Sequence, residues 1–420
     1  MKNSKRKLNT GRSDKRESTL CRVLFVDHTS VLSGGELAML AFVKHIDRSR
    51  FEPIVLLFEP GPLEQELRPY ARVILMPLPS ALIRSRRAEV QIGLSTLSSI
   101  LTFLPFLARL AKTIKSVNPD LVHTNSLKAD VLAGFAARLI GVPVIWHVRD
   151  RIDTDYLPGF AVSLIRLLSR CLPTLVIANS ASTLATLPAQ LKKRSQVISS
   201  GLDLAPFAAS GQNSERLSEA IEAGREIRIG LVGRICRWKG QHIFIEAAEI
   251  VRRIYPNARF LIIGAPLFGE DAYQKELETL VIERHLETGV EFLGFRKNMP
   301  ETMANLHLVA HTSIIPEPFG QVIIQGMAAG KPVIATEGGG PSEIIQNTKT
   351  GRLIRRADSG SLAAAIIETL DSPNVAETMA FAAQEEALTK YGIGITAPQI
   401  ERAYLDACPS RKPYVPLSQI

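Results

Sequence analysis

The chain has 420 residues, too many for one ordinary hydrophobic core, and this length suits two domains of about 200 residues each. Lysine and arginine (50) outnumber aspartate and glutamate (41), which favours anionic partners such as a nucleotide-sugar, an acidic lipid or a nucleic acid. No apolar run reaches the roughly 18 to 20 residues that a membrane-spanning helix needs, so we expect a protein that is soluble or bound at a surface.

The start of the chain and its cysteines indicate the compartment. Residues 1–19 are rich in Lys, Arg, Ser and Asn and lack the apolar core of a signal peptide. The four cysteines lie far apart without C-x-x-C spacing, which favours a reducing compartment and no structural zinc. We therefore expect a cytoplasmic protein whose residues 1–19 form a disordered basic tail.

From residue 20 onwards, short apolar runs typical of buried strands alternate with helix-like runs. This alternation is the βαβ pattern of a parallel sheet covered by helices. It predicts a first Rossmann-like domain at 20–200. The strand-like runs of this domain are 22–26, 54–58, 73–76, 121–123, 144–146 and 175–178.

The same pattern returns after a polar stretch that we interpret as a linker at 201–226. It predicts a second Rossmann-like domain at 227–381, and two such units would form a cleft between the carboxyl ends of their sheets. The strand-like runs of the second domain are 227–232, 260–264, 290–294, 308–311 and 333–335.

Two cations flank the turn after the strand predicted at 227–232. Gly233 and Arg234 follow this strand, and Lys239 precedes the helix predicted at 241–254. A departing diphosphate develops negative charge as its bond breaks, and fixed cations lower the barrier without a metal. Arg234 and Lys239 are therefore candidate catalytic residues, and a solvated pair of loop charges is the alternative.

The segment 316–336 reads as an acidic loop, a glycine turn, a helix and a buried strand. Glu317 precedes the helix start near Gly320, where free backbone N–H groups and the helix dipole would face a diphosphate. Phe319, Gly320 and Gln321 are therefore candidate donor-binding residues, the glycine because it lets the backbone approach a phosphate closely. For Glu317, the alternative is a surface acid that favours the helix start.

This segment resembles the E-x7-E signature of the retaining glycosyltransferases of family 4, two-domain enzymes that use nucleotide-sugar donors. The resemblance extends to the Gly-Arg and Lys-Gly pairs at 233–234 and 239–240, to the glycine pair at 34–35 and to His147, so it covers most of residues 21–405. The second acid of the pattern is Gln325 here. An amide can still bind ribose hydroxyls with weaker, uncharged hydrogen bonds, and a merely polar helix face is the alternative.

The resemblance implies an α/β protein of the GT-B fold, in which two Rossmann-like domains face each other across a cleft. The first domain would bind the acceptor and the second the nucleotide-sugar, and a helix within 382–420 would cross back to the first domain. Glu317 would bind hydroxyls of the donor sugar, His147 would position this sugar, and Gly35 would shape the phosphate and acceptor side of the cleft. A plain helix start for Gly35 and a structural role for His147 are the alternatives.

No residue pattern of a metal site is present, so we expect neither a metal nor a cofactor. Retaining enzymes of this kind are thought to use the departing phosphate as the base, and Asp150 is an alternative base. Glu343 follows three glycines at 338–340, and we interpret it as favouring the start of the next helix.

Residues 83–87 are basic, and 97–114 has helix-spaced apolar residues. Docking on an anionic membrane surface is one interpretation, and a half-buried helix under the first sheet is the one we favour for the helix.

We predict a cytoplasmic retaining hexosyltransferase, placed in the cytosol or at the inner membrane face. It would transfer a sugar from a nucleotide-diphosphate donor to a glycan or a lipid-linked glycan in envelope or exopolysaccharide synthesis. A nucleotide-sugar epimerase and a catalytically silent binding homologue are the alternatives. Nucleic acid is not an expected partner, because only 6% of residues are aromatic and no binding module is recognisable.

Overall fold

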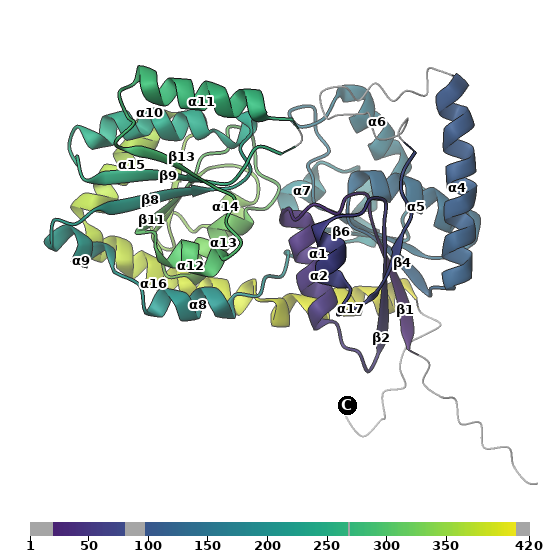
Figure 1. Cartoon of the computed structure of the whole chain (residues 1–420). Helices are drawn as coiled ribbons and strands as arrows, with labels where there is room; N and C mark the ends of the chain where they lie inside the picture. Colours follow the sequence, from purple (N-terminus) through teal and green to yellow (C-terminus); the bar gives the residue numbers. More distant parts are fainter. Residues whose placement is uncertain (1–19, 80–96, 268, 409–420) are drawn as a thin grey trace, which may run out of the picture.

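The computed structural model describes residues 20–79, 97–267 and 269–408. Two parallel sheets lie side by side, each with helices on both faces (Figure 1). The predicted α/β class with two doubly wound units is therefore confirmed. The tail predicted at 1–19 and the basic residues at 83–87 lie outside the described residues.

The first sheet has seven parallel strands in the order β3-β2-β1-β4-β5-β6-β7. All of its central strands are apolar and buried, as expected for strands covered on both faces. Six of them confirm the predicted runs, and the short edge strand β7 was not predicted. The strands are β1 (Cys21–Asp27), β2 (Phe51–Leu57), β3 (Arg72–Leu75), β4 (Leu121–Thr124), β5 (Val144–Val148), β6 (Leu175–Ala178) and β7 (Ser195–Val197).

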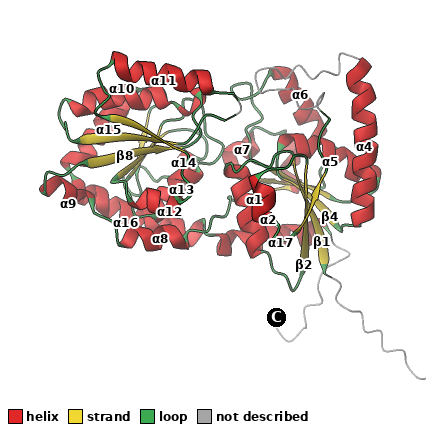
Figure 2. Ribbon diagram, in the orientation of Figure 1, coloured by secondary structure: helices red, strands yellow, loops and turns green. Residues whose placement is uncertain are grey.

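Two hydrophobic cores cover the two faces of this sheet. Helices α1, α2 and α17 (Ile393–Ala407) pack on one face, and α4, α5 and α6 pack on the other (Figure 2). In α4, Phe106, Leu110 and Ile114 are buried against the sheet, which confirms the half-buried helix, while Leu104 is 58% exposed. The helices of this domain are α1 (Gly34–His45), α2 (Pro62–Leu67), α4 (Leu97–Val117), α5 (Leu127–Leu139), α6 (Gly159–Leu168), α7 (Ala181–Ala185) and the 3-10 helix η3 (Ala189–Arg194).

The second sheet has six parallel strands in the order β10-β9-β8-β11-β12-β13. Its five predicted strands are confirmed, and the short edge strand β13 was not predicted. The strands are β8 (Ile227–Val232), β9 (Ala258–Ile263), β10 (Val290–Gly294), β11 (Leu308–His311), β12 (Val333–Thr336) and β13 (Arg352–Ile354).

Two further cores cover the faces of the second sheet, one built on α10, α11 and α15 and the other on α8, α12, α13 and α16. The helices are α8 (Ala205–Gln212), α9 (Leu217–Glu222), η4 (Arg237–Lys239), α10 (Gln241–Arg252), α11 (Asp271–Glu283), α12 (Met299–Ala304), α13 (Gln321–Ala328), α14 (Pro341–Ile344), α15 (Ser359–Asp371), α16 (Pro373–Lys390) and α17 (Ile393–Ala407).

The chain passes between the domains at two places that lie side by side. The Leu202 N–H donates to the Tyr391 carbonyl at 3.1 Å, and the Ile393 N–H donates to the Leu202 carbonyl at 2.8 Å. The segment interpreted as a linker at 201–226 carries α8 and α9, and their residues Phe207 and Leu217 pack in the cores of the second domain. The expected final helix is two helices: α16 packs on the second domain, and α17 packs on the first sheet.

Both sheets reverse their strand order in the middle, between β1 and β4 in the first and between β8 and β11 in the second. Ligands of open α/β sheets bind at such points, beyond the carboxyl ends of the strands. In the first sheet these ends are Asp27 and Thr124, and in the second they are Val232 and His311. The fold therefore directs the search for a site to these two edges.

Candidate active site

Contacts between the domains bring the two edges together. The Gln321 side-chain amide of α13 donates to the Gly34 carbonyl of the first domain at 2.9 Å. The Trp238 ring, in η4, packs edge-on against the Tyr156 ring of the first domain, with 5.9 Å between the ring centroids. Both contacts join residues at the carboxyl edge of the second sheet to the first domain.

Two predicted catalytic residues form a half-enclosed ion pair. The Lys239 ammonium lies 2.8 Å from both Glu317 oxygens, and the two side chains are 16% and 11% exposed. Burial alone would raise the pKa of Glu317, but the charge of Lys239 and the hydrogen bond from His311 hold it well below its usual range. Glu317 is therefore a carboxylate at neutral pH. The sequence predicted both residues at the site, and the structure adds that they bind each other.

Two side chains that sequence reasoning missed, Ser313 and His311, contact the Glu317 carboxylate. The Ser313 hydroxyl donates to Glu317 Oε2 at 2.8 Å, and His311 Nε2 lies 3.4 Å from the same oxygen. Thr336, at the end of β12, donates to the Ser313 carbonyl at 2.9 Å. The signal in the sequence was available, because His311 and Thr336 end strands that were predicted correctly.

Arg234 and Lys239 meet at one aromatic ring. The Arg234 guanidinium carbon lies 5.9 Å from the centre of the Trp238 ring, and Lys239 Nζ lies 4.5 Å from it. Gly233 precedes them with a φ of 150°, and its carbonyl would lie only 1.9 Å from a β-carbon at Gly264. This close approach of the β8 and β9 ends explains why two glycines stand there.

The other predicted donor-binding residues begin α13. Gly320 is the N-cap of this helix with a φ of 109°, a value that favours glycine. Phe319 is buried, and its ring lies 6.2 Å from the Tyr391 ring, so its side chain belongs to the core. Gln325 is half-buried one turn into the helix. The Gln321 side chain donates to the Gly34 carbonyl of the first domain, a contact that the sequence did not predict.

In the first domain, His147 lies at the end of β5 and is only 1% exposed. Its Nδ1 is 3.1 Å from His123 Nε2 and 3.3 Å from the Arg149 guanidinium. Burial, together with the charge of Arg149, lowers the pKa of His147 well below the ordinary value, so its imidazole is neutral. Its Nε2 is buried and has no hydrogen-bond partner within the described residues.

Arg149 was seen in the sequence only as part of a polar run, and the structure places it under the Gly34-Gly35 loop. A β-carbon at Gly35 would lie 3.3 Å from Arg149 Cδ, so the glycine leaves room for this arginine. The guanidinium donates to Asn125 Oδ1 at 2.8 Å and to the Ser200 hydroxyl at 2.7 Å. The alternative base, Asp150, accepts a hydrogen bond from the Tyr156 hydroxyl at 2.6 Å.

Glu343 lies in the first turn of α14, as interpreted from the sequence, and it also has a second role that was not predicted. Its carboxylate crosses to the first domain and accepts from the Ala181 N–H at 2.9 Å and the Ser182 N–H at 2.6 Å, at the start of α7. Beside it, the Pro318 carbonyl accepts from the Ser180 hydroxyl at 2.6 Å and the Thr183 hydroxyl at 3.1 Å. These bonds tie the loop that carries Glu317 to the first domain.

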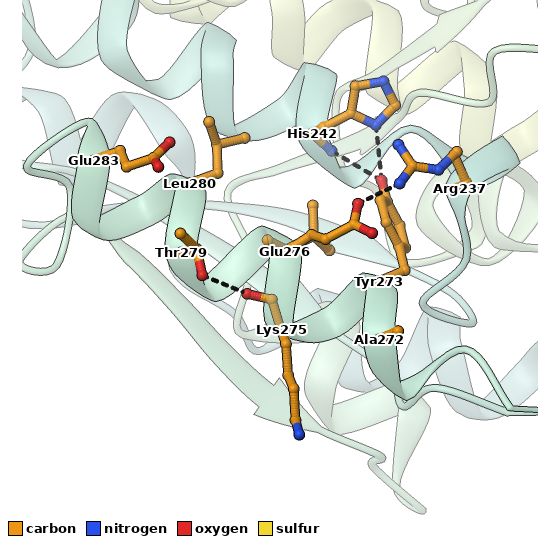
Figure 3. Close-up of a pocket in the computed structure, with 10 residues that line it drawn as sticks. Arg237, His242, Ala272, Tyr273, Lys275, Glu276, Thr279, Leu280 and Glu283 are labelled. Carbon is orange, nitrogen blue, oxygen red and sulfur yellow. Dashed lines mark hydrogen bonds and ion pairs between the residues drawn. The ribbon is translucent and has the colours of Figure 1, made fainter.

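A hollow of about 520 Å³ lies elsewhere, along α11 on the second domain (Figure 3). Four of its polar side chains pair with one another: Arg237 pairs with Glu276, and the Tyr273 hydroxyl lies 2.7 Å from His242 Nδ1. None of the predicted site residues lines it. Across the described part of the chain, no group of three or more His, Cys, Asp or Glu side chains could hold a metal ion.

Two family models match the chain. The model of Glycosyltransferase Family 4 matches residues 32–206, and the model of Glycosyl transferases group 1 matches residues 213–386. Together they span both domains.

Two relatives and one solved structure share 23% to 30% sequence identity with the chain. The chain is similar to a D-inositol 3-phosphate glycosyltransferase of Corynebacterium urealyticum, with 30% identity over 221 residues, and there it spans about half of the relative's length (51% of each chain). It is 23% identical to the UDP-Gal:alpha-D-GlcNAc-diphosphoundecaprenol alpha-1,3-galactosyltransferase of Escherichia coli, over 92% of this chain and 97% of the relative. Among solved structures, Anabaena HepE in complex with UDP and glucose superimposes with a TM-score of 0.77 and 28% identity, over 90% of this chain and 98% of HepE.

Proposed function

Because the chain belongs to the glycosyltransferases of family 4 and group 1, with their GT-B fold, we propose that it is a retaining hexosyltransferase. It would move a hexose from a nucleotide-diphosphate sugar to an acceptor hydroxyl. The observation that carries this proposal is the Lys239–Glu317 pair beside Arg234, at the edge of the second sheet that faces the first domain.

The diphosphate of the donor would lie among the cations and the start of α13. Arg234 and Lys239 supply fixed positive charge, and the first turn of α13 after Gly320 supplies backbone N–H groups. Gly233 and Gly35 allow the backbone to come close. Gln325, further along α13, would bind the ribose. The solved complexes of HepE contain UDP, glucose and UDP-glucose, which supports a UDP-sugar as the first donor to test.

In the reaction, the bond between the anomeric carbon and the donor phosphate oxygen breaks, and the acceptor oxygen bonds to this carbon on the same face. The acceptor proton passes to the departing phosphate oxygen. Arg234 and Lys239 stabilise the negative charge that develops on the diphosphate, as preorganised cations that need no reorientation. Glu317 and His147 would hold hydroxyls of the sugar, so no protein nucleophile is required.

The acceptor would be a glycan or a lipid-linked glycan of envelope or exopolysaccharide synthesis. The name of the Escherichia coli relative, which includes a diphosphoundecaprenol acceptor, supports a lipid-linked class. We place the enzyme in the cytoplasm, with contact to the inner membrane face through the exposed Leu104 and the basic Arg109 of α4. In the described residues, no helix has the length and apolarity to cross a bilayer. Flotation with anionic liposomes tests the contact, and an absence of binding at low salt would refute it.

A two-step experiment tests the function. In a thermal-shift panel of nucleotide-sugars, the correct donor at one hundred times its dissociation constant should add about 2.7 kcal/mol of stability. Nucleotide release is then measured with and without candidate acceptors. Release that depends on the acceptor supports the transferase, whereas conversion of the donor without any acceptor supports the epimerase. Donor binding without release under any condition would identify a catalytically silent homologue.

A further inference from the structure

Three buried side chains that pack in the first domain and the half-buried Arg149 form a continuous hydrogen-bonded chain. The Tyr404 hydroxyl lies 2.7 Å from His123 Nδ1, His123 Nε2 lies 3.1 Å from His147 Nδ1, and Arg149 lies 3.3 Å from the same Nδ1. Tyr404 is on α17, the helix that returns from the second domain, and it is 0% exposed. The proposed transfer reaction gives no role to Tyr404, His123 or Arg149.

Arg149 determines where the proton of His147 resides. A guanidinium can only donate hydrogen bonds, so its contact with His147 Nδ1 requires this nitrogen to be the acceptor. The imidazole is neutral, because burial and the neighbouring Arg149 and His123 disfavour its charged form and lower its pKa. A neutral imidazole carries one proton, so this proton is on Nε2.

The same reasoning orients His123 and Tyr404. Since His147 Nδ1 is an acceptor, His123 must approach it with an Nε2–H donor. His123 is also neutral, because burial lowers its pKa to about 3, so its Nδ1 is an acceptor and the Tyr404 hydroxyl donates to it. The Tyr404 ring is held by edge contacts to Phe42 and Phe51, with centroids 5.9 Å and 5.7 Å away, which fixes the direction of its hydroxyl.

We propose that Tyr404, His123 and Arg149 are positioning residues that lock His147 as the Nε2–H tautomer, which would donate a hydrogen bond to one oxygen of the donor sugar. The unpartnered, buried Nε2 of His147 is the second observation that points to a ligand. An Nε2–H group can only donate, so the sugar hydroxyl must accept there and direct its own proton elsewhere. The sugar is thereby held in one orientation before the bond breaks. This inference rests on the proposed function.

Nuclear magnetic resonance on the full chain with ¹⁵N-labelled histidine reads the tautomer without any activity. Among the signals of the eight histidines, those of His147 are identified because they are absent from the spectrum of His147→Gln. We expect His147 to show a protonated Nε2 and an unprotonated Nδ1 from pH 6 to pH 8, and His123 to show the same tautomer. A proton on His147 Nδ1, or a charged His147 in this range, would overturn the inference even if the protein transfers sugar.

Kinetic measurements then test whether this orientation of His147 affects turnover. Tyr404→Phe removes one hydroxyl and keeps the ring, and it should lower kcat about threefold to tenfold, the range expected for one hydrogen bond. With the monodeoxy donor that lacks the oxygen bound by His147, the penalty should vanish. Tyr255→Phe is the matched control, because it removes a tyrosine hydroxyl bonded to Asp371 on the second domain. An equal loss with every deoxy donor would refute the positioning role, and no transfer by the parent protein with any donor and acceptor would instead refute the proposed function.

Discussion

The two edges of the candidate site are built differently. The edge of the second domain is charged, and its central pair, Lys239 and Glu317, is 78 residues apart within one domain. The edge of the first domain, called the neutral edge after its uncharged Tyr404, His123 and His147, also holds the half-buried cation Arg149, and His123 and Tyr404 are 281 residues apart and come from different parts of the sequence. The charged edge suits a diphosphate, and the neutral edge suits a sugar hydroxyl. Their sensitivity to mutation and pH should differ accordingly.

The largest effect should follow Lys239→Ala. Loss of one preorganised charge at the departing group should lower kcat about 100-fold to 1000-fold. Arg237→Ala is the matched control, because this neighbouring cation is 61% exposed and pairs with Glu276 away from the cleft. Unchanged turnover in Lys239→Ala would remove the catalytic role of the charged edge.

Lys239→Ala also leaves the buried Glu317 without its cation, which by itself destabilises a protein. The double variant Lys239→Ala with Glu317→Gln should therefore recover much of the urea stability and none of the turnover. Recovery of turnover together with stability would show that the single variant lost activity only because it unfolded.

The neutral edge should reveal itself in the pH dependence of stability. The folded-state pKa values of His123 and His147 lie below the ordinary 6.5, because burial and Arg149 disfavour their charged forms, although Asp27 acts in the opposite direction on His123. The unfolded chain then binds protons that the folded chain does not. The free energy of unfolding is therefore unaffected by these groups above pH 6.5 and falls as the pH drops towards about 3, by about 1.4 kcal/mol per pH unit for each histidine.

Urea unfolding of wild type and His123→Gln between pH 7 and pH 5 measures this contribution. The variant should show a pH slope that is smaller by about 1.4 kcal/mol per unit below pH 6.5. Tyr255→Phe serves as the control, since this tyrosine is bonded to Asp371 on the second domain and burial raises its pKa to about 12, so it does not titrate here. Equal slopes in wild type and His123→Gln would mean that His123 is charged in the folded protein.

The contrast between the edges also explains what the sequence could predict. Buried strands appear in the sequence as apolar runs, and the polar residues that follow these runs predict Arg234, Glu317 and His147 at sheet edges. The edge strands β7 and β13 were missed because each has three residues and is half exposed, so neither forms an apolar run.

Contact partners that tertiary packing brings together left no such pattern in the sequence. Nothing in the sequence near His147 indicates that Tyr404 will orient it, and nothing near Glu343 indicates that α7 of the other domain will supply its hydrogen-bond donors. The pairing of Lys239 with Glu317 likewise depends on how the loops after β8 and β11 approach each other. The residue types at strand ends can therefore be predicted from the sequence, but the contacts between these residues can be identified only from the structure.

The smallest effect concerns the bonds that join the two edges. The Glu343 carboxylate accepts hydrogen bonds from two N–H groups at the start of α7. The neighbouring Pro318 carbonyl accepts hydrogen bonds from the Ser180 and Thr183 hydroxyls. Glu343→Gln removes the charge from this contact, which should cost about 0.5 to 2 kcal/mol, as for the loss of a helix cap. Because these bonds hold the domains in the arrangement that the structure shows, the cost should appear as weaker donor binding, with kcat nearly unchanged.

Calorimetric donor affinity, kcat and small-angle scattering together check this expectation. Glu343→Gln should bind the donor about 2-fold to 30-fold more weakly and show a larger radius of gyration, whereas the exposed Glu385→Gln of α16 should match wild type in all three. If Glu343→Gln instead lowered kcat with unchanged donor affinity, the contact would act on the reacting groups themselves. The two edges would then not be separable, and the comparison between a charged and a neutral edge would have to give way to a single cooperative site.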